Sequence, residues 1–312
     1  MVDIYISEDN MLVKSNEIKN GVWVNMVNPT EDEINYVSDK LSLDIDFIKS
    51  ALDEEERSRI DTDEDTGHVL IVVDIPYIGL ELDSKVYETI PLGIILTDLC
   101  IVTVCLKEAL VLNGFLSGSV KTFFTFKKSR FILQILYKNA DLYLQYLKQI
   151  DRRSSIIEEE LHKSMKNKEL IQLLSVEKSL VYFSTSLKAN ELVMEKLLRY
   201  DFIKKYPDDT ELLEDTIIEN KQAIEMAKIY SDILSGTMDA FASVISNNLN
   251  IVMKVLTSIT IVMAIPTIIA SLFGMNVPIP GSGNPFSFYI IMIGSVFICT
   301  AVTIAMSKRN MF

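Results

Sequence analysis

Two long apolar runs without a charged residue lie near the C-terminal end of the chain. The first covers residues 255–273 and the second covers residues 286–306, and a short uncharged loop separates them. At the rise of an α-helix the second run would be about 31 Å long, which matches the hydrocarbon core of a bilayer. The pattern therefore predicts a transmembrane hairpin.

A polar stripe runs along the first of these two spans and into the segment before it. Alternating steps of three and four residues reach positions that share one face of a helix. Most of these positions hold Ser, Thr or Asn, in a segment otherwise built from Ile, Val, Leu and Met. The stripe consists of Asp239, Ser243, Ser246, Asn250, Met253, Thr257, Thr260, Ala264, Thr267 and Ser271.

Polar groups at membrane depth face a partner helix or a water-filled path, because lipid does not satisfy them. For any single Ser or Thr, helix packing or a hydrogen bond to its own helix is the more common role. A stripe that extends from Asp239 and Asn250 to Asn276 favours a pore. Met253 and Leu256 would then form a hydrophobic constriction, or they are ordinary packing residues.

The first part of the chain, to about residue 107, has the pattern of a mixed α and β domain. β-Branched runs of strand length predict strands over 2–6, 22–27, 69–75, 86–97 and 101–106. Thr30 and Glu33 have capping-box spacing and predict a helix that runs to about Leu41. A second short helix is expected over 45–52, Trp23 is expected in the core, and Gly114 and Gly118 are expected in a loop. This pattern predicts a mixed sheet with helices on its faces.

The chain from about residue 129 is predicted to be helical. Residues 129–165 and 168–206 form two long segments that we expect to pair as an antiparallel hairpin. A third helix is expected to start at Pro207 and, with no further proline before Pro266, to continue to residue 273. Its apolar positions repeat in heptads between Leu213 and Ile259, which indicates packing either between copies of the chain or within one copy.

The predicted fold is therefore α+β, with a stalk helix that continues into the membrane hairpin. The expected parts are a cytosolic α/β domain over 1–128, a long-helix hairpin over 129–207, a stalk over 208–250, a first span over 251–273, an outer loop over 274–285, a second span over 286–306 and a cytosolic tail over 307–312. Two spans do not enclose a channel, so a pore would need several copies.

Composition excludes several classes of function. The formal net charge of −13 disfavours nucleic acid as a partner and suits cations. The three cysteines and two histidines have no metal-ligand spacing, and neither a glycine-rich phosphate loop nor an activated nucleophile is evident, so we do not expect an enzyme. The N-terminus has no apolar segment typical of a signal peptide.

One acidic cluster is similar to a calcium-binding EF-hand loop. Asp61, Asp63, Asp65 and Gly67 have part of that spacing, but the closing position holds Val72 instead of Glu, and the Gly is one place late. A polar turn before a strand is the simpler interpretation, and a looser divalent-cation site remains an alternative.

The end of the first span carries a resemblance to a known family. Gly274-Met275-Asn276, with Met253-Lys254-Val255-Leu256-Thr257 upstream and Ser235-Gly236 before Asp239, resembles the CorA-type magnesium transporters. The resemblance extends to the architecture of the whole chain and is residue-specific over 232–276. It implies a homopentameric divalent-cation channel in the cell membrane that imports Mg²⁺, with Co²⁺ and Ni²⁺ as further candidates.

The resemblance also implies roles for individual residues. Gly274, Met275 and Asn276 would form the outer selectivity mouth. Magnesium bound between cytosolic domains would hold the channel closed, with Asp215 as the stalk ligand and its partner from the region of Asp53 in a neighbouring subunit. This sequence departs from the family in having Ala264 at a position that is often bulky and apolar, in lacking an acidic residue in the outer loop, and in having a short basic tail.

The chemistry of such a pore follows from the hydration of magnesium. Mg²⁺ holds its water tightly, so amide oxygens of Asn250 and Asn276 would accept hydrogen bonds from coordinated waters. The membrane potential would drive entry with about 4.6 kcal/mol per 100 mV for a dication. Lys254, Lys308 and Arg309 favour a cytosolic location for both termini. The alternatives are a Zn²⁺ transporter of the same superfamily, or an acidic sensor or scaffold that the hairpin only anchors.

Overall fold

The computed structural model describes residues 1–312 apart from 9–10, 82–83, 121, 165–166, 276–285 and 310–312. Its elements are β1 (Val2–Glu8), β2 (Met11–Ser15), β3 (Trp23–Val27), α1 (Glu31–Leu41), α2 (Ile45–Ser50), β4 (Arg59–Thr62), β5 (Val69–Glu81), β6 (Ser84–Leu96), β7 (Ile101–Cys105), α3 (Leu110–Leu116), α4 (Lys128–Ser164), α5 (Asn167–Leu197), α6 (Asp201–Lys204), α7 (Pro207–Phe273) and α8 (Ser287–Lys308). They form two compact units, Met1–Gly236 and Thr237–Phe312, and α7 contributes to both. The predicted fold class is confirmed.

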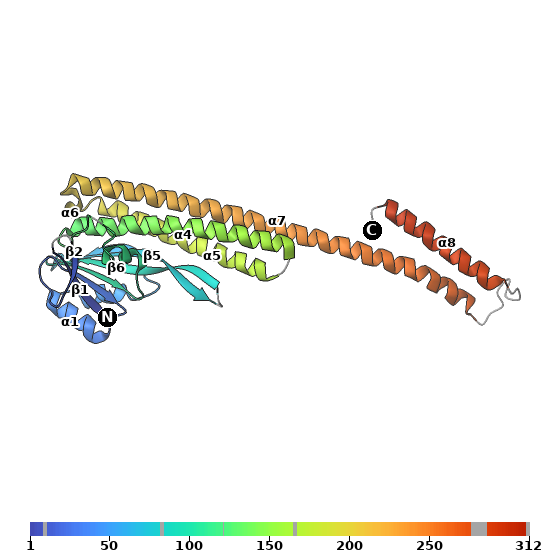
Figure 1. Ribbon diagram of the computed structural model, residues 1–312, viewed down its shortest axis with the longest axis horizontal. Coiled ribbons are helices and arrows are strands. Elements are labelled where there is room, and N and C mark those ends of the chain that lie inside the picture. The colour runs from blue at the N-terminus through green and yellow to red at the C-terminus, as the bar shows by residue number, and fades with distance from the viewer. Residues whose placement is uncertain (9–10, 82–83, 121, 165–166, 276–285, 310–312) are drawn as a thin grey trace. The chain divides into compact units, whose positions relative to one another are not determined.

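The first unit is built on one seven-stranded sheet in the order β2-β1-β3-β7-β6-β5-β4. Neighbouring strands are antiparallel except β3 and β7, which run parallel at the centre. One face of the sheet packs against α1 and α2, and the other face packs against α3, α4 and α5. The sheet is therefore the middle of three layers, as Figure 1 shows for this unit.

The start of α1 follows the expectation from its capping-box spacing. The Thr30 hydroxyl accepts a hydrogen bond from the Glu33 amide at 3.3 Å, and the Glu33 carboxylate accepts one from the Thr30 amide at 2.9 Å. The helix ends at Leu41, where Ser42 adopts a left-handed conformation with φ of 51°. The capping box is confirmed.

Trp23 lies in the core, as predicted. Its side chain is fully buried, and its indole Nε1 donates a hydrogen bond to the Thr103 hydroxyl at 2.8 Å. The rings of Tyr5, Phe123 and Phe131 surround it. The indole N–H therefore has a partner inside an otherwise aromatic environment.

Several sequence-based expectations for this unit were incomplete or wrong. β2, β4 and α3 were not predicted, and Gly114 lies inside α3 rather than in a loop. The helix expected over 168–206 is interrupted, because α5 ends at Leu197 and α6 begins at Asp201. The turn between them brings Ile203 into the core, where its side chain is fully buried.

A polar cluster joins the sheet to α4 and α5 and consists of Ser58, Asp74, Asn139, Tyr143 and Asn190. The Asp74 carbonyl in β5 accepts hydrogen bonds from Asn139 Nδ2 at 2.9 Å, Tyr143 OH at 3.2 Å and Asn190 Nδ2 at 2.8 Å. Asn190 Oδ1 accepts hydrogen bonds from the Asp74 amide at 2.9 Å and from the Ser58 hydroxyl at 3.0 Å. β4 pairs only with Val69–Val72, so the Asn190 amide replaces a strand partner at Asp74.

Helices α4, α5 and the part of α7 in the first unit lie side by side (Figure 1). Asn220 of α7 is buried and donates to the Leu187 carbonyl of α5 at 2.9 Å. Asp209, near the start of α7, accepts a hydrogen bond from the Ser129 hydroxyl at 2.6 Å and pairs with Arg130 at 3.3 Å. These contacts hold the first turns of α4 and α7 together.

Candidate functional site

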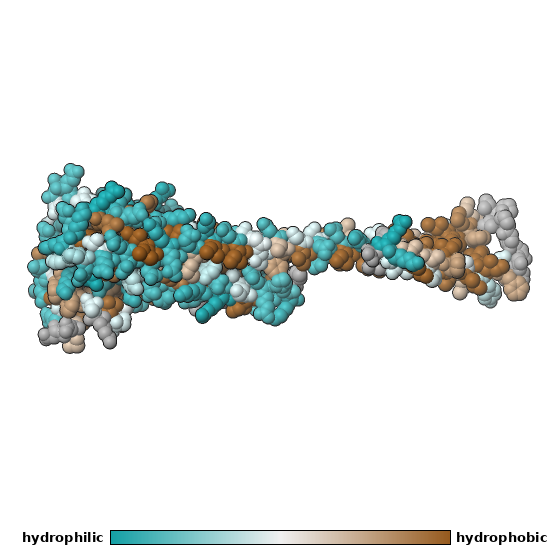
Figure 2. Space-filling model, turned by 90° about the horizontal axis from the view of Figure 1, so that it is seen from above, coloured by the Kyte–Doolittle hydropathy of each residue, from teal (hydrophilic) through white to brown (hydrophobic). Residues whose placement is uncertain are grey.

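The second unit consists of two apolar helices whose side chains are largely exposed. The C-terminal part of α7 and the whole of α8 are long and apolar enough to cross a membrane. The core helix of a soluble protein also passes that test, but it is mostly buried, whereas these segments are not. Figure 2 shows the apolar surface that gathers over them. A surface of this kind is stable in lipid and unstable in water.

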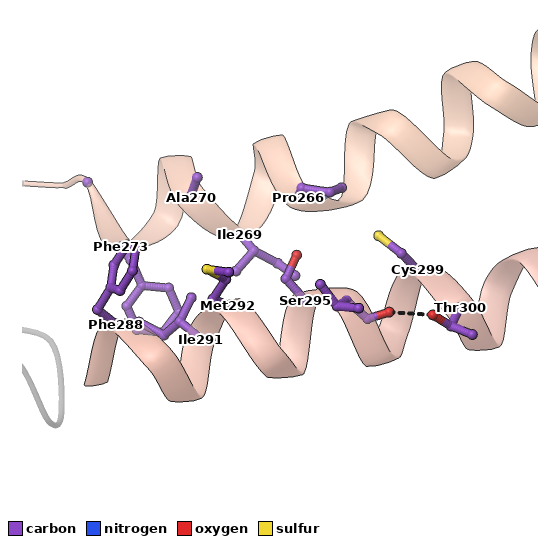
Figure 3. A pocket seen from close by; sticks show the side chains of 12 residues that line it. Pro266, Ile269, Ala270, Phe273, Phe288, Ile291, Met292, Ser295, Cys299 and Thr300 are labelled. Atoms are coloured by element: carbon purple, nitrogen blue, oxygen red, sulfur yellow. Dashed lines mark hydrogen bonds between the residues drawn. The ribbon is translucent and has the colours of Figure 1, made fainter. Parts of the chain in front are cut away.

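One face of α7 packs against α8, and we call it the hairpin seam. Its least exposed positions are Val255, Ser258, Val262, Ile265 and Ile269, with Ser258 fully buried. Beside the seam lies a groove of about 640 Å³, shown in Figure 3. The groove is lined by Pro266, Ile269, Ala270, Phe273 and Gly274 of the first helix and its end, and by Phe288, Ile291, Met292, Ser295, Val296, Cys299 and Thr300 of α8.

The predicted polar stripe lies on the opposite face of α7. Each stripe position from Met253 to Ser271 is two residues from a seam position, which is about 200° around the helix axis. The positions proposed to line a pore are all exposed in the single chain: Asp239, Ser246, Asn250, Met253, Leu256, Thr257, Thr260, Ala264, Thr267 and Ser271. The hairpin partner α8 therefore does not cover the stripe.

Several stripe hydroxyls also bond to their own helix. Thr260 donates to the Leu256 carbonyl at 2.8 Å, Thr267 donates to the Met263 carbonyl at 3.1 Å, and Ser243 donates to the Asp239 carbonyl at 3.1 Å. A hydroxyl that donates its proton in this way still has lone pairs to accept another hydrogen bond. The Thr260 and Thr267 oxygens are thus available as acceptors on an exposed face.

Helix α7 ends at Phe273, immediately before the Gly-Met-Asn motif. The Gly274 amide donates to the Ala270 carbonyl at 2.9 Å, and a Cβ at Gly274 would lie 3.2 Å from the same oxygen. Met275 is exposed. Asn276, which the sequence predicts as part of the selectivity mouth, lies outside the described residues, as does the rest of the outer loop.

The carboxylates expected to hold regulatory magnesium lie at the surface of the first unit. Asp53 and Asp215 are both exposed. Asp53 accepts a hydrogen bond from the Glu55 amide at 3.0 Å, and the neighbouring Glu54 pairs with Lys107 at 3.2 Å. Among the described residues, no group of three or more His, Cys, Asp or Glu side chains is arranged to hold a metal within one chain.

The acidic loop similar to an EF-hand is a turn between β4 and β5. Asp63 accepts hydrogen bonds from the Asp65 amide at 2.9 Å and the Thr66 hydroxyl at 2.5 Å, and these bonds lower its pKa. Gly67 has a φ of 71°, which is the left-handed conformation that closes the turn. The simpler interpretation of this stretch, a polar turn before a strand, agrees with the structure.

One residue that sequence reasoning did not assign to the site is Cys299. Its thiol lies 3.7 Å from the Val262 carbonyl of α7, on the seam side of the hairpin. A signal was present in the sequence, because Val262 is four residues before Pro266 and a proline cannot bond that carbonyl. The sequence does not reveal which side chain of the second span reaches it.

The fold and the two apolar helices define a membrane protein with two C-terminal spans, an exposed polar stripe along the first span and a mixed α/β domain. The family of the CorA-like Mg²⁺ transporter protein matches residues 19–309, and the chain belongs to this family. The resemblance found in the sequence is thereby confirmed.

Individual relatives agree with this assignment. The cobalt/magnesium transport protein CorA of Methanocaldococcus jannaschii is 27% identical over 287 residues, which cover 89% of this chain and 87% of that protein. The protein of the same name from Thermotoga maritima is 31% identical over 148 residues, which cover 44% of this chain and 39% of that protein.

Solved structures show the same fold. The complete structure of the CorA magnesium transporter from Methanocaldococcus jannaschii has a TM-score of 0.84 at 25% identity and covers 99% of this chain and 98% of its own. The structure of the full-length CmaX protein has a TM-score of 0.72 at 16% identity and covers 100% of this chain and 97% of its own. At this identity the likeness shows the fold alone.

Proposed function

We propose that several copies of this chain form a channel that imports Mg²⁺ down its electrochemical gradient. Five copies, as the family resemblance implies, would bring five polar stripes together around one axis. In this arrangement α7 lines the pore, α8 contacts lipid, and both termini lie in the cytosol. Co²⁺ and Ni²⁺ are candidate further substrates.

The observation that carries this proposal is the position of the polar stripe. It is exposed on the face of α7 opposite the hairpin seam, so α8 does not satisfy its polar groups. Three of the stripe hydroxyls donate to their own helix, but in a bilayer the Asn250 amide and the acceptor lone pairs of the stripe still need a partner or water, because lipid offers neither. A water-filled path between copies of α7 meets that need without any further protein.

The stripe is suited to a hydrated cation. Asn250 at one end and the hydroxyls of Thr257, Thr260 and Thr267 offer neutral oxygens, which accept hydrogen bonds from the waters of Mg²⁺. Neutral oxygens bind the hydrated ion less tightly than carboxylates would, so the ion also leaves. We propose the same role for Asn276 at the outer mouth.

Gating would use the acidic cytosolic part. Magnesium bound between neighbouring copies, at Asp215 of one and near Asp53 of the next, would hold the acidic surfaces together and keep the channel closed. When internal Mg²⁺ falls, these surfaces would repel and the pore would open.

The test is magnesium uptake into proteoliposomes under a membrane potential and low internal Mg²⁺. Asn276→Ala and Asn250→Leu each remove a ring of amide oxygens, and we expect uptake to fall at least about tenfold, because a hydrogen bond to a charged group contributes about 1.5–3 kcal/mol. Zn²⁺ and Co²⁺ are added as competitors, and the inhibition of Mg²⁺ uptake by each ion ranks the ions as substrates.

A matched pair of threonines provides the control. Thr260 lies on the stripe and Thr300 lies on α8, and each hydroxyl donates to a carbonyl of its own helix at 2.8 Å. Thr260→Val should lower uptake, whereas Thr300→Val should leave it unchanged. Equal effects of the two substitutions would contradict a pore along the stripe. A folded oligomer without magnesium flux would favour zinc transport or an anchored sensor.

A further inference from the structure

Pro266 leaves one carbonyl of α7 without its usual partner. In an α-helix the amide of residue 266 would donate to the carbonyl of residue 262, but proline has no N–H. At membrane depth a carbonyl of this kind is costly to leave unpaired, because lipid has no donor. The Val262 carbonyl therefore needs a donor from outside its own backbone ladder.

The structure supplies that donor from α8. The Cys299 Sγ lies 3.7 Å from the Val262 carbonyl oxygen, within the range of a sulfur hydrogen bond. Figure 3 shows the sulfur directed from α8 toward the turn of α7 that carries Pro266. Pro266 and Cys299 both line the groove between the two helices.

Neighbouring hydroxyls of α8 are used differently. Thr300 donates to the Val296 carbonyl and Thr303 donates to the Cys299 carbonyl, each at 2.8 Å within α8 itself. These bonds are the usual local ones for Thr in a membrane helix. The Cys299 bond, in contrast, joins the two helices.

We propose that Cys299 is a positioning residue for the pore helix. Its thiol donates to the carbonyl that Pro266 frees, and this bond fixes the local conformation of α7 around Val262. The stripe residues Thr260 and Ala264 are two positions to either side of Val262 and project from the opposite face. The orientation of the polar path at this depth then depends on a contact with α8. This role rests on the proposed function only where it concerns transport.

The hydrogen bond itself can be tested without transport. The S–H stretching band of Cys299 is obtained as the infrared difference between the full-length protein and Cys299→Val. In Pro266→Ala the new amide bonds the Val262 carbonyl and releases the thiol, so we expect the band to move to higher frequency. A band at the same frequency in both backgrounds would overturn the proposal.

Transport tests the consequence of the bond. Cys299→Val, which fills the space of the thiol but cannot donate, should lower magnesium uptake about threefold, the factor that corresponds to a typical hydrogen bond between membrane helices. Cys299→Ser keeps a donor and should retain wild-type uptake. In the Pro266→Ala background Cys299→Val should have no further effect, because the carbonyl has a backbone partner.

The controls separate this proposal from the proposed function. Thr300→Val changes the adjacent residue without touching Val262 and should leave uptake unchanged in both backgrounds. If Cys299→Val lowers uptake equally with and without Pro266, or if Cys299→Ser behaves like Cys299→Val, the positioning role is wrong. If the wild-type protein carries no magnesium, the proposed function fails while the infrared shift still decides whether the bond exists.

Discussion

We expect the loss of the Asn190 side chain to weaken the first unit, Met1–Gly236, most clearly. It is buried and makes three hydrogen bonds, two with the backbone of Asp74 and one with the Ser58 hydroxyl. Asn190→Ala removes all three. The Asp74 carbonyl keeps Asn139 and Tyr143 as donors, whereas the Asp74 amide loses the acceptor that pairs it.

The magnitude follows from these partners. A buried amide left without an acceptor costs about 1–3 kcal/mol, and each of the other two hydrogen bonds contributes about 0.5–1 kcal/mol net. We therefore expect Asn190→Ala to lower the free energy of unfolding by about 3 kcal/mol. This loss is a large fraction of the stability of a typical domain.

Fluorescence offers a direct assay. Trp23 is the single tryptophan of the chain and is fully buried in the same unit, so its emission reports the unfolding of this unit by urea in detergent-solubilised protein. Lys188→Ala, on the exposed face of the same helix, is the control and should change the free energy by less than about 0.5 kcal/mol. A loss below about 1 kcal/mol for Asn190→Ala would refute the role of its amide as a strand substitute.

Two further predictions concern charge. Burial raises the pKa of the Asp74 carboxyl group, so folding favours its protonated form. Asp74→Asn should therefore be more stable than wild type at pH 7 in the Trp23 assay, and the difference should shrink as the pH falls through the raised pKa; a constant difference would contradict this. Asp215→Ala should raise the internal Mg²⁺ concentration that half-inhibits uptake by up to about fivefold, on the scale of one exposed charge contact. Glu214→Ala, also exposed, is its control, and equal inhibition in wild type and Asp215→Ala would count against the regulatory role.

The sequence predicted the elements whose signals are local. The β-branched runs located five strands, and the spacing of Thr30 and Glu33 located the start of α1. The missed strands β2 and β4 lie at the two edges of the sheet, are short and carry charged residues, so they resemble turns. Helix α3 was missed because Gly114 inside it indicates a loop.

The arrangement of the site could be predicted only in part. The period of the stripe shows that its residues share a face, but it does not show which face α8 covers, because that depends on packing between helices. The hydrogen bond between Cys299 and Val262 and the polar cluster at Asp74 join residues that are far apart in sequence. An aspartate within the β-branched run 69–75 was a signal that this strand needed polar partners.

The replacement of a strand by Asn190 also affects how this protein behaves at high concentration. Beyond Val72 the outer edge of β5 has no neighbouring strand in the described sheet, and such an edge can pair with another chain. On this edge the Asn190 side chain forms hydrogen bonds with both the backbone N–H and the backbone C=O of Asp74. Because backbone groups alternate between the two sides of a strand, Pro76 faces the same edge and offers no N–H. Two successive outward positions of β5 therefore offer no free N–H for intermolecular strand addition, which is one way in which natural sheets avoid edge-to-edge aggregation.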